Sequence, residues 1–78
     1  MFLAAAVQMN ATADIEQNWS QTLELIERAA GHGAQFVATP EHSRILAPMP
    51  EMVRTAEPLD GPTCQRYASL ATRLGIVL

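Results

Sequence analysis

Continuous apolar runs along the chain indicate three short strands. Residues Phe2 to Met9 are apolar almost throughout and lack the alternation of a half-exposed strand, which favours a strand buried on both faces of a parallel sheet. Ala34 to Thr39 forms a second run, and Pro40 ends it because proline has no N–H to donate to a sheet ladder. Ile76 to Leu78 begins a third strand at the last residue.

Helical periodicity separates the first two strands. A helix is predicted from the N-cap Asp14 to about Ala30, with its apolar side chains within an arc of roughly 120°. The arc contains Ile15, Trp19, Thr22, Leu23, Ile26, Ala29 and Ala30, and its flank contains Asn18 and Leu25. Gly31-His32-Gly33 ends the helix with a glycine for the left-handed position, and His32 is expected to interact with the helix C-terminus.

A second helix is predicted to begin at Pro62, where proline fits best, and to end at Gly75. Its apolar face is formed by Cys64, Tyr67, Leu70, Ala71 and Leu74. Residues 41–61 show no period, so we predict a long loop with one helical turn near Glu51–Arg54.

The resulting order, β-α-β-loop-α-β, predicts an α/β fold with a parallel sheet. Three strands and two helices cannot cover both faces of such a sheet or protect its edges. We therefore expect residues 1–78 to be the N-terminal part of a single larger domain that is truncated after its third strand.

Composition narrows the class of protein. With 78 residues, 49% of them hydrophobic, 17% charged and a net charge of −3, the chain has no basic patch for nucleic acid and no cationic face for a membrane. The N-terminal apolar run lacks a basic start and is too short for a signal peptide, so a cytoplasmic location is expected and the sequons at Asn10 and Asn18 are chance matches. A single cysteine, Cys64, excludes an internal disulfide and a multi-cysteine zinc site, and no metal or cofactor is expected.

Glu41 is the main candidate for chemistry. Ligands of open α/β sheets bind outside the carboxyl ends of the strands, and Glu41 follows the second strand there, directly after Pro40. A loop above it could partly desolvate the carboxylate and make it a stronger base. The position alone leaves open whether Glu41 is a base or only a turn residue.

The other polar residues have more ordinary interpretations. His42 is read as a solvated loop histidine, and Cys64 as a small hydrophobe at the edge of an apolar stripe. Arg44 and Arg54 could clamp a substrate carboxylate, but a surface role is the simpler interpretation. Packing is expected for Trp19 and Tyr67, and solvation for Glu51, Glu57 and Asp60.

Several stretches together resemble the start of the nitrilase superfamily, the carbon–nitrogen hydrolases. They are Ala6-Val7-Gln8-Met9, Asp14 with Asn18, Ala29-Ala30 leading to Gly33-Ala34, Val37-Ala38-Thr39-Pro40-Glu41, Ala56 to Thr63, and Gly75 to Leu78. Their order and spacing cover nearly the whole chain, with an amidase-like pattern around Glu41.

The resemblance implies a four-layer α-β-β-α sandwich that dimerises or forms higher oligomers, and a Glu-Lys-Cys catalytic set. Glu41 takes the place of the general base in this set, the substrate is a small amide or nitrile, and the reaction passes through a thioester. The chain has no lysine, and Cys64 does not match the family nucleophile, so residues 1–78 alone are expected to be inactive. Many carbamoyl-hydrolysing members of the family have a Gly-Tyr a few residues after the glutamate, and this chain lacks it. The resemblance therefore favours amidases of small linear ω-amides or deaminated peptides over true nitrilases.

Two other functions are alternatives to the hydrolase. A non-catalytic binding or regulatory subunit could complete its sheet with a partner chain. A nucleotide-binding half-domain is not supported, because Gln8-Met9-Asn10-Ala11 has no glycine for a phosphate-binding turn.

Overall fold

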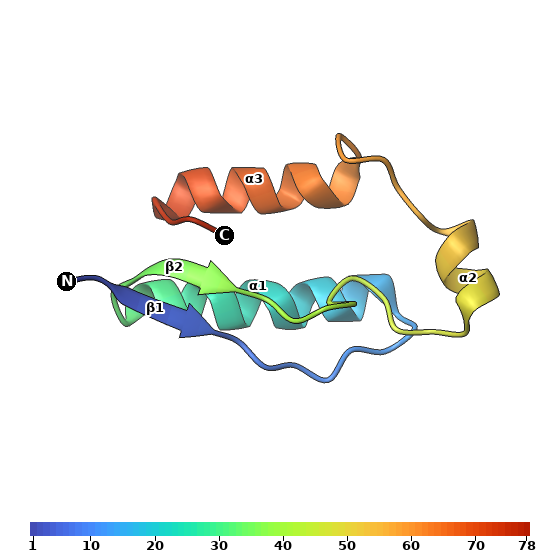
Figure 1. The fold of residues 1–78 in the computed structure, drawn as a ribbon, viewed down its shortest axis with the longest axis horizontal. Coiled ribbons are helices and arrows are strands. Elements are labelled where there is room, and N and C mark those ends of the chain that lie inside the picture. The colour runs from blue at the N-terminus through green and yellow to red at the C-terminus, as the bar shows by residue number, and fades with distance from the viewer.

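The computed structural model describes residues 1–78 as two strands and three helices (Figure 1). In chain order these are β1 (Leu3–Ala6), α1 (Ile15–Gly31), β2 (Ala34–Ala38), α2 (Met49–Arg54) and α3 (Pro62–Leu74). The strands are parallel and are joined through α1, which confirms the predicted β-α-β start. The single predicted helical turn between β2 and α3 is the short helix α2.

The sheet is smaller than the sequence predicts. β1 is paired from Leu3, opposite Ala34, to Ala6, opposite Ala38, and the Val7 N–H still donates to the Ala38 carbonyl at 3.0 Å. The predicted strand to Met9 is therefore too long, because the neighbouring strand ends before Pro40 and offers no further partner.

The predicted third strand is present only as one parallel bridge. Val77 pairs with Phe36, its N–H donates to the Gln35 carbonyl at 2.9 Å, and its carbonyl accepts from the Val37 N–H at 2.8 Å. The direction and position of the prediction are correct, but the pairing does not extend into a strand.

The helix ends follow local sequence signals. The Asp14 carboxylate accepts a hydrogen bond from the Gln17 N–H at 3.0 Å, which is the expected N-cap. His32 is the C-cap of α1, with its N–H directed to the carbonyls of the last turn, and Gly33 follows with a φ of 96°. Gly75 ends α3 in the left-handed conformation, with a φ of 66°.

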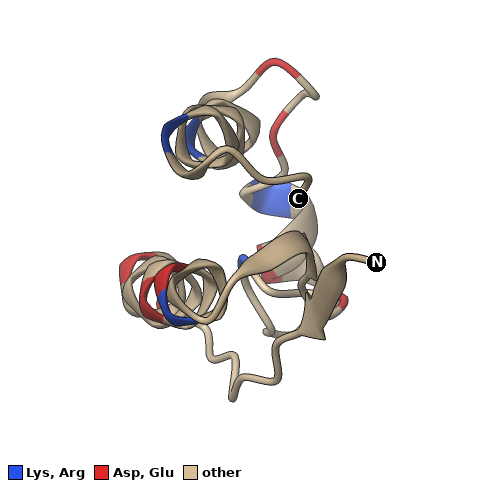
Figure 2. Cartoon of the chain, turned by 90° about the vertical axis from the view of Figure 1, so that its left-hand side faces the viewer, with Lys and Arg blue, Asp and Glu red and all other residues tan.

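The core lies between the sheet and the two long helices. α1 and α3 pack on the same side of the sheet, and Ile26, Ala34, Val37 and Leu70 form the buried cluster between them (Figures 1 and 2). The strands carry no charged residue, and the acidic and basic residues of α1 and α3 lie away from the sheet (Figure 2).

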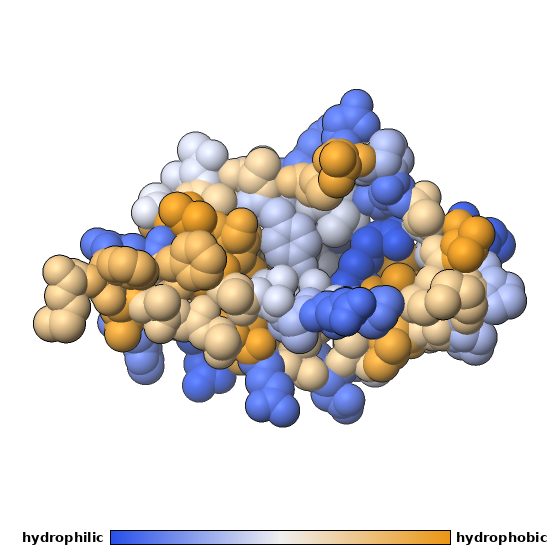
Figure 3. Space-filling model, viewed as in Figure 1, coloured by the Kyte–Doolittle hydropathy of each residue, from blue (hydrophilic) through white to orange (hydrophobic).

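The opposite face of the sheet is bare. Phe36 is 45% exposed and Val77 is 61% exposed, and an apolar surface extends over this end of the molecule in Figure 3. No helix of the chain has the length and apolar character needed to cross a membrane.

Candidate functional site

Glu41 lies at the carboxyl end of β2, at the start of a loop that turns toward α2 (Figure 1). This segment, from Thr39 to Leu46, is called the Glu41 loop below. The Glu41 side chain is 89% exposed, and its Oε1 lies 3.7 Å from Nε2 of His42. Residues 1–78 therefore do not provide the expected partial desolvation of the Glu41 carboxylate. The position of Glu41 at the end of the strand is as predicted.

His42 has an unusual backbone conformation. Its φ of 59° lies in the left-handed region, and it is the one non-glycine residue of the chain with a positive φ. This conformation costs an L-residue about 1–2 kcal/mol, so it persists only where surrounding contacts hold the chain. The contacts that hold the Glu41 loop come from three segments.

The first contact is made by Asn18 of α1, whose side chain is completely buried. Its Nδ2 donates to the Thr12 carbonyl at 2.7 Å and to the Arg44 carbonyl at 2.8 Å, and its Oδ1 accepts from the Thr12 N–H at 2.9 Å. The Leu46 N–H donates to the same Thr12 carbonyl at 3.0 Å. Asn18 thus joins the loop after β1 to the loop after β2, and its burial could not be read from its position on the helix flank.

The second contact is an ion pair between Arg44 and Glu57. Arg44 donates from a terminal nitrogen to Oε2 of Glu57 at 3.0 Å and from Nε to the hydroxyl of Thr63 at 3.0 Å. The other Glu57 oxygen accepts from the Thr63 N–H at 2.9 Å, in the first turn of α3. These two side chains are only 21% and 24% exposed, so the expected surface arginine and solvated carboxylate are instead a fixed pair.

This arrangement also changes the acidity of Glu57. The hydrogen bond from the Thr63 N–H, with smaller contributions from the Thr63 hydroxyl and the charge of Arg44, holds the pKa of Glu57 below its ordinary value. The Arg54 guanidinium similarly lowers the pKa of Glu51, to which it donates two hydrogen bonds in α2. Arg54 is thus engaged within its own helix.

The third contact joins the Glu41 loop to the middle of α3. The hydroxyls of Ser43 and Tyr67 lie 3.0 Å apart, and the Tyr67 ring packs edge-to-face against Trp19 at 5.6 Å. Trp19 and Tyr67 therefore pack as expected, but the hydroxyl of Tyr67 also holds the loop.

An open groove of about 440 Å³ follows this contact. Its lining includes Thr39 and Ser43 from the Glu41 loop, Cys64 from α3 and Leu78. The Cys64 thiol is free and exposed, so the small hydrophobe expected at the edge of the apolar stripe does not pack into the core.

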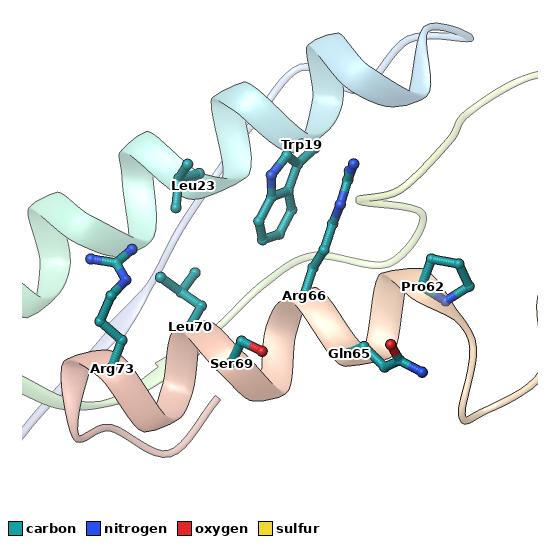
Figure 4. Close-up of a pocket in the computed structure, with 8 residues that line it drawn as sticks. All are labelled: Trp19, Leu23, Pro62, Gln65, Arg66, Ser69, Leu70 and Arg73. Carbon is teal, nitrogen blue, oxygen red and sulfur yellow. The ribbon is translucent and has the colours of Figure 1, made fainter.

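A second groove, of about 560 Å³, lies between α1 and α3 (Figure 4). Trp19 forms one wall, with the Arg66 guanidinium 5.3 Å from its ring centroid. Arg66 is paired with Glu16 and Arg73 with Glu27, both at 3.1 Å, so both cations of this groove are already neutralised. None of its lining residues belongs to the Glu41 loop. No three His, Cys, Asp or Glu side chains of the chain are grouped to hold a metal ion.

The structure thus reveals side chains that hold the Glu41 loop and that the sequence did not identify. Asn18, Glu57 and Thr63 lie 23, 16 and 22 positions away from Glu41, respectively, as counted along the printed sequence. The one available signal for Asn18 was its place beside an apolar stripe, four residues after the N-cap Asp14.

Comparisons with known proteins agree with this organisation. The family model for carbon–nitrogen hydrolases matches residues 3–78. The deaminated glutathione amidase of Bos taurus is 39% identical over 77 residues, which cover 97% of this chain and 24% of that protein. The deaminated glutathione amidase of Homo sapiens is 35% identical over the same coverage. The chain thus spans about a quarter of the length of these curated relatives, and no solved structure gives a significant match.

Proposed function

Because the chain belongs to the carbon–nitrogen hydrolase family, we propose that it is the N-terminal part of an amidase in which Glu41 acts as general base. The observation that carries this proposal is the position of Glu41 at the carboxyl end of a parallel strand. The strained residue that follows it and the three anchors of its loop add support, because strained backbone is concentrated at functional sites.

In this proposal Glu41 removes the proton from a cysteine thiol, and the thiolate attacks the carbon of the amide. A lysine ammonium stabilises the resulting tetrahedral oxyanion, and the protonated Glu41 returns its proton to the leaving nitrogen as ammonia or an amine departs. Water then hydrolyses the thioester to the carboxylic acid and the free thiol. Residues 1–78 contain no lysine, and Cys64 is not assigned as the nucleophile, so both partners belong to another part of the protein. The isolated chain is consequently expected to release no product.

The proposed substrate is a small linear amide, such as an ω-amide or a deaminated peptide. Its support is the identity to two deaminated glutathione amidases over nearly the whole chain, together with the Thr39-Pro40-Glu41-His42 pattern. We further propose that the full-length protein is cytoplasmic and forms a homodimer or higher oligomer. Light scattering on the purified full-length protein tests the oligomeric state.

The test uses the full-length protein and follows ammonia release from short ω-amides and from deaminated glutathione. General base catalysis contributes about 10²- to 10⁴-fold, so Glu41→Gln should lower kcat by that factor with little change in thermal stability. Glu24→Gln is the matched control, because Glu24 is an exposed carboxylate of α1 without a side-chain hydrogen bond or ion pair. Wild-type kcat in Glu41→Gln, or equal losses in both variants, would contradict the proposal.

One observation favours a second candidate function, a non-catalytic binding or regulatory subunit. The bare sheet face at Phe36 and Val77 could pack against a partner chain. This alternative predicts that the full-length protein hydrolyses none of the amides tested and copurifies in a stable hetero-complex.

A further inference from the structure

The side chain of Asn18 uses its whole hydrogen-bonding capacity inside the protein. Its two amide hydrogens are donated to the carbonyls of Thr12 and Arg44, and its oxygen faces the N–H of Thr12 and, at 3.3 Å, the Thr12 hydroxyl. The orientation of the amide is fixed by this arrangement, because the reverse orientation would direct its oxygen at two carbonyls. The absence of exposed surface also closes the sequon at Asn18 in this fold.

One of these bonds reaches the segment that carries the candidate base. Arg44 is three residues after Glu41, and the strained His42 lies between them. Before Glu41, Pro40 restricts the chain through its ring, and after it the Asn18 amide holds the Arg44 carbonyl. The left-handed turn is therefore restrained on both sides, and this fixes the backbone position from which the Glu41 side chain extends.

We propose that Asn18 is a positioning residue for Glu41, an inference that rests on the proposed role of Glu41 as general base. Asn18 does not contact the substrate in this proposal. It holds the loop after β2 against the start of α1, so that the carboxylate meets its proton donor in a productive geometry. A misplacement of about 1 Å at a reacting group can reduce the rate by about 10²-fold.

Packing alone does not explain an asparagine at this position. An apolar side chain at this position would leave the Thr12 N–H and the Arg44 carbonyl without this partner, whereas the amide satisfies both and so specifies one arrangement of the two loops. Thr22 is an internal comparison, because it is also completely buried on α1 and its hydroxyl contacts the sulfur of Met9 at 3.3 Å. This contact lies outside the Glu41 loop.

The experiment measures kcat, KM and the melting temperature of full-length Asn18→Leu and Thr22→Val, with the amide that gives the highest wild-type activity. Leucine keeps the branched shape of asparagine, is somewhat larger and cannot form its hydrogen bonds. We expect Asn18→Leu to lower kcat by about 10- to 100-fold with a smaller change in KM, and Thr22→Val to keep kcat within about twofold. If Asn18→Leu does not fold, Asn18→Ser, which keeps a small polar group, is compared in the same way.

A double-mutant cycle separates positioning from general destabilisation. Glu41→Asp keeps a carboxylate on a shorter side chain and leaves a measurable rate, and Asn18→Leu is introduced into this background. If Asn18 acts through Glu41, its loss should lower kcat much less in Glu41→Asp than in the wild type. Equal factors in both backgrounds, or equal effects of the Asn18 and Thr22 variants, would overturn the inference. Wild-type kcat in Glu41→Gln would instead overturn the proposed function, so the two failures are distinguishable.

Discussion

Two neighbouring residues of β2, Phe36 and Val37, provide a test of how the sheet is covered. Val37 is completely buried toward α1 and α3, whereas Phe36 is directed to the opposite face and is 45% exposed. Val37→Ala removes two methyl groups, which corresponds to about 1.6 kcal/mol of transfer free energy and about 2 kcal/mol with the cavity term. Phe36→Ala would cost below about 1 kcal/mol on a face that stays bare.

The four-layer sandwich predicts a different order in the full-length protein. There a second sheet would cover the bare face, and Phe36→Ala should cost about 3–5 kcal/mol, more than Val37→Ala. The assay is urea unfolding of the full-length protein and both variants, with the midpoint and the slope fitted separately. Gln35→Ala is the control, because Gln35 is an exposed residue of the same strand.

Either of two independent outcomes would contradict the prediction. A cost below about 1 kcal/mol for Phe36→Ala would show that no second layer covers this face, and the sandwich would then be wrong. A cost below about 1 kcal/mol for Val37→Ala would contradict the packing of α1 and α3 on the sheet. The ranking is more robust than either value, because both variants share one unfolded state and one assay.

Two further predictions concern the supports of the Glu41 loop. Because the pKa of Glu57 is lowered in the folded protein, its ionised carboxylate stabilises the fold above the ordinary pKa of 4.5, and this stabilisation is lost as the pH falls below that value. Glu57→Gln should therefore flatten the decline of the melting temperature between about pH 7 and 3. An unchanged acid slope would refute this. His42→Gly should be neutral or stabilising by up to about 1 kcal/mol in chemical unfolding, since glycine removes the left-handed strain, whereas His42→Val should destabilise by about 1–2 kcal/mol. Equal stability of the two variants would show that the backbone is not strained.

The parts of the fold that could be predicted are those with local causes. Asp14 caps a helix through a bond to a residue three positions away, and Gly33 and Gly75 take positive φ angles that other residues avoid. The extent of the sheet has a non-local cause, because each strand residue needs a partner on a neighbouring strand. The sequence therefore predicted the position of the strand at Val77, but the observed pairing is a single bridge between Val77 and Phe36.

The contacts of the polar residues near the site could not be predicted, for the same reason. A helical wheel places Asn18 on the flank of the apolar arc by its angle alone, and this angle does not show whether the side chain is buried. Its burial depends on the loop after β2, which is 26 residues away in the sequence when measured to Arg44. Glu57 was assigned to solvent because the loop around it has no period, yet it joins Arg44 to the N-terminal turn of α3.

Asn18 and Glu57 both hold the Glu41 loop, and this has a consequence for interpreting Glu41 itself. The sequence next to Glu41 indicates that a carboxylate follows a strand, whereas the backbone that carries it is held by contacts to the loop after β1 and to the segment before α3. Substitutions at position 18 or 57 could therefore change the rate of the proposed reaction without any contact to the substrate. The Glu41 side chain is 89% exposed, with His42 Nε2 at 3.7 Å, so within residues 1–78 the loop backbone sets the point from which the carboxylate extends. If positions 18 and 57 both act in this way, their effects on kcat should be coupled, since each restrains Arg44.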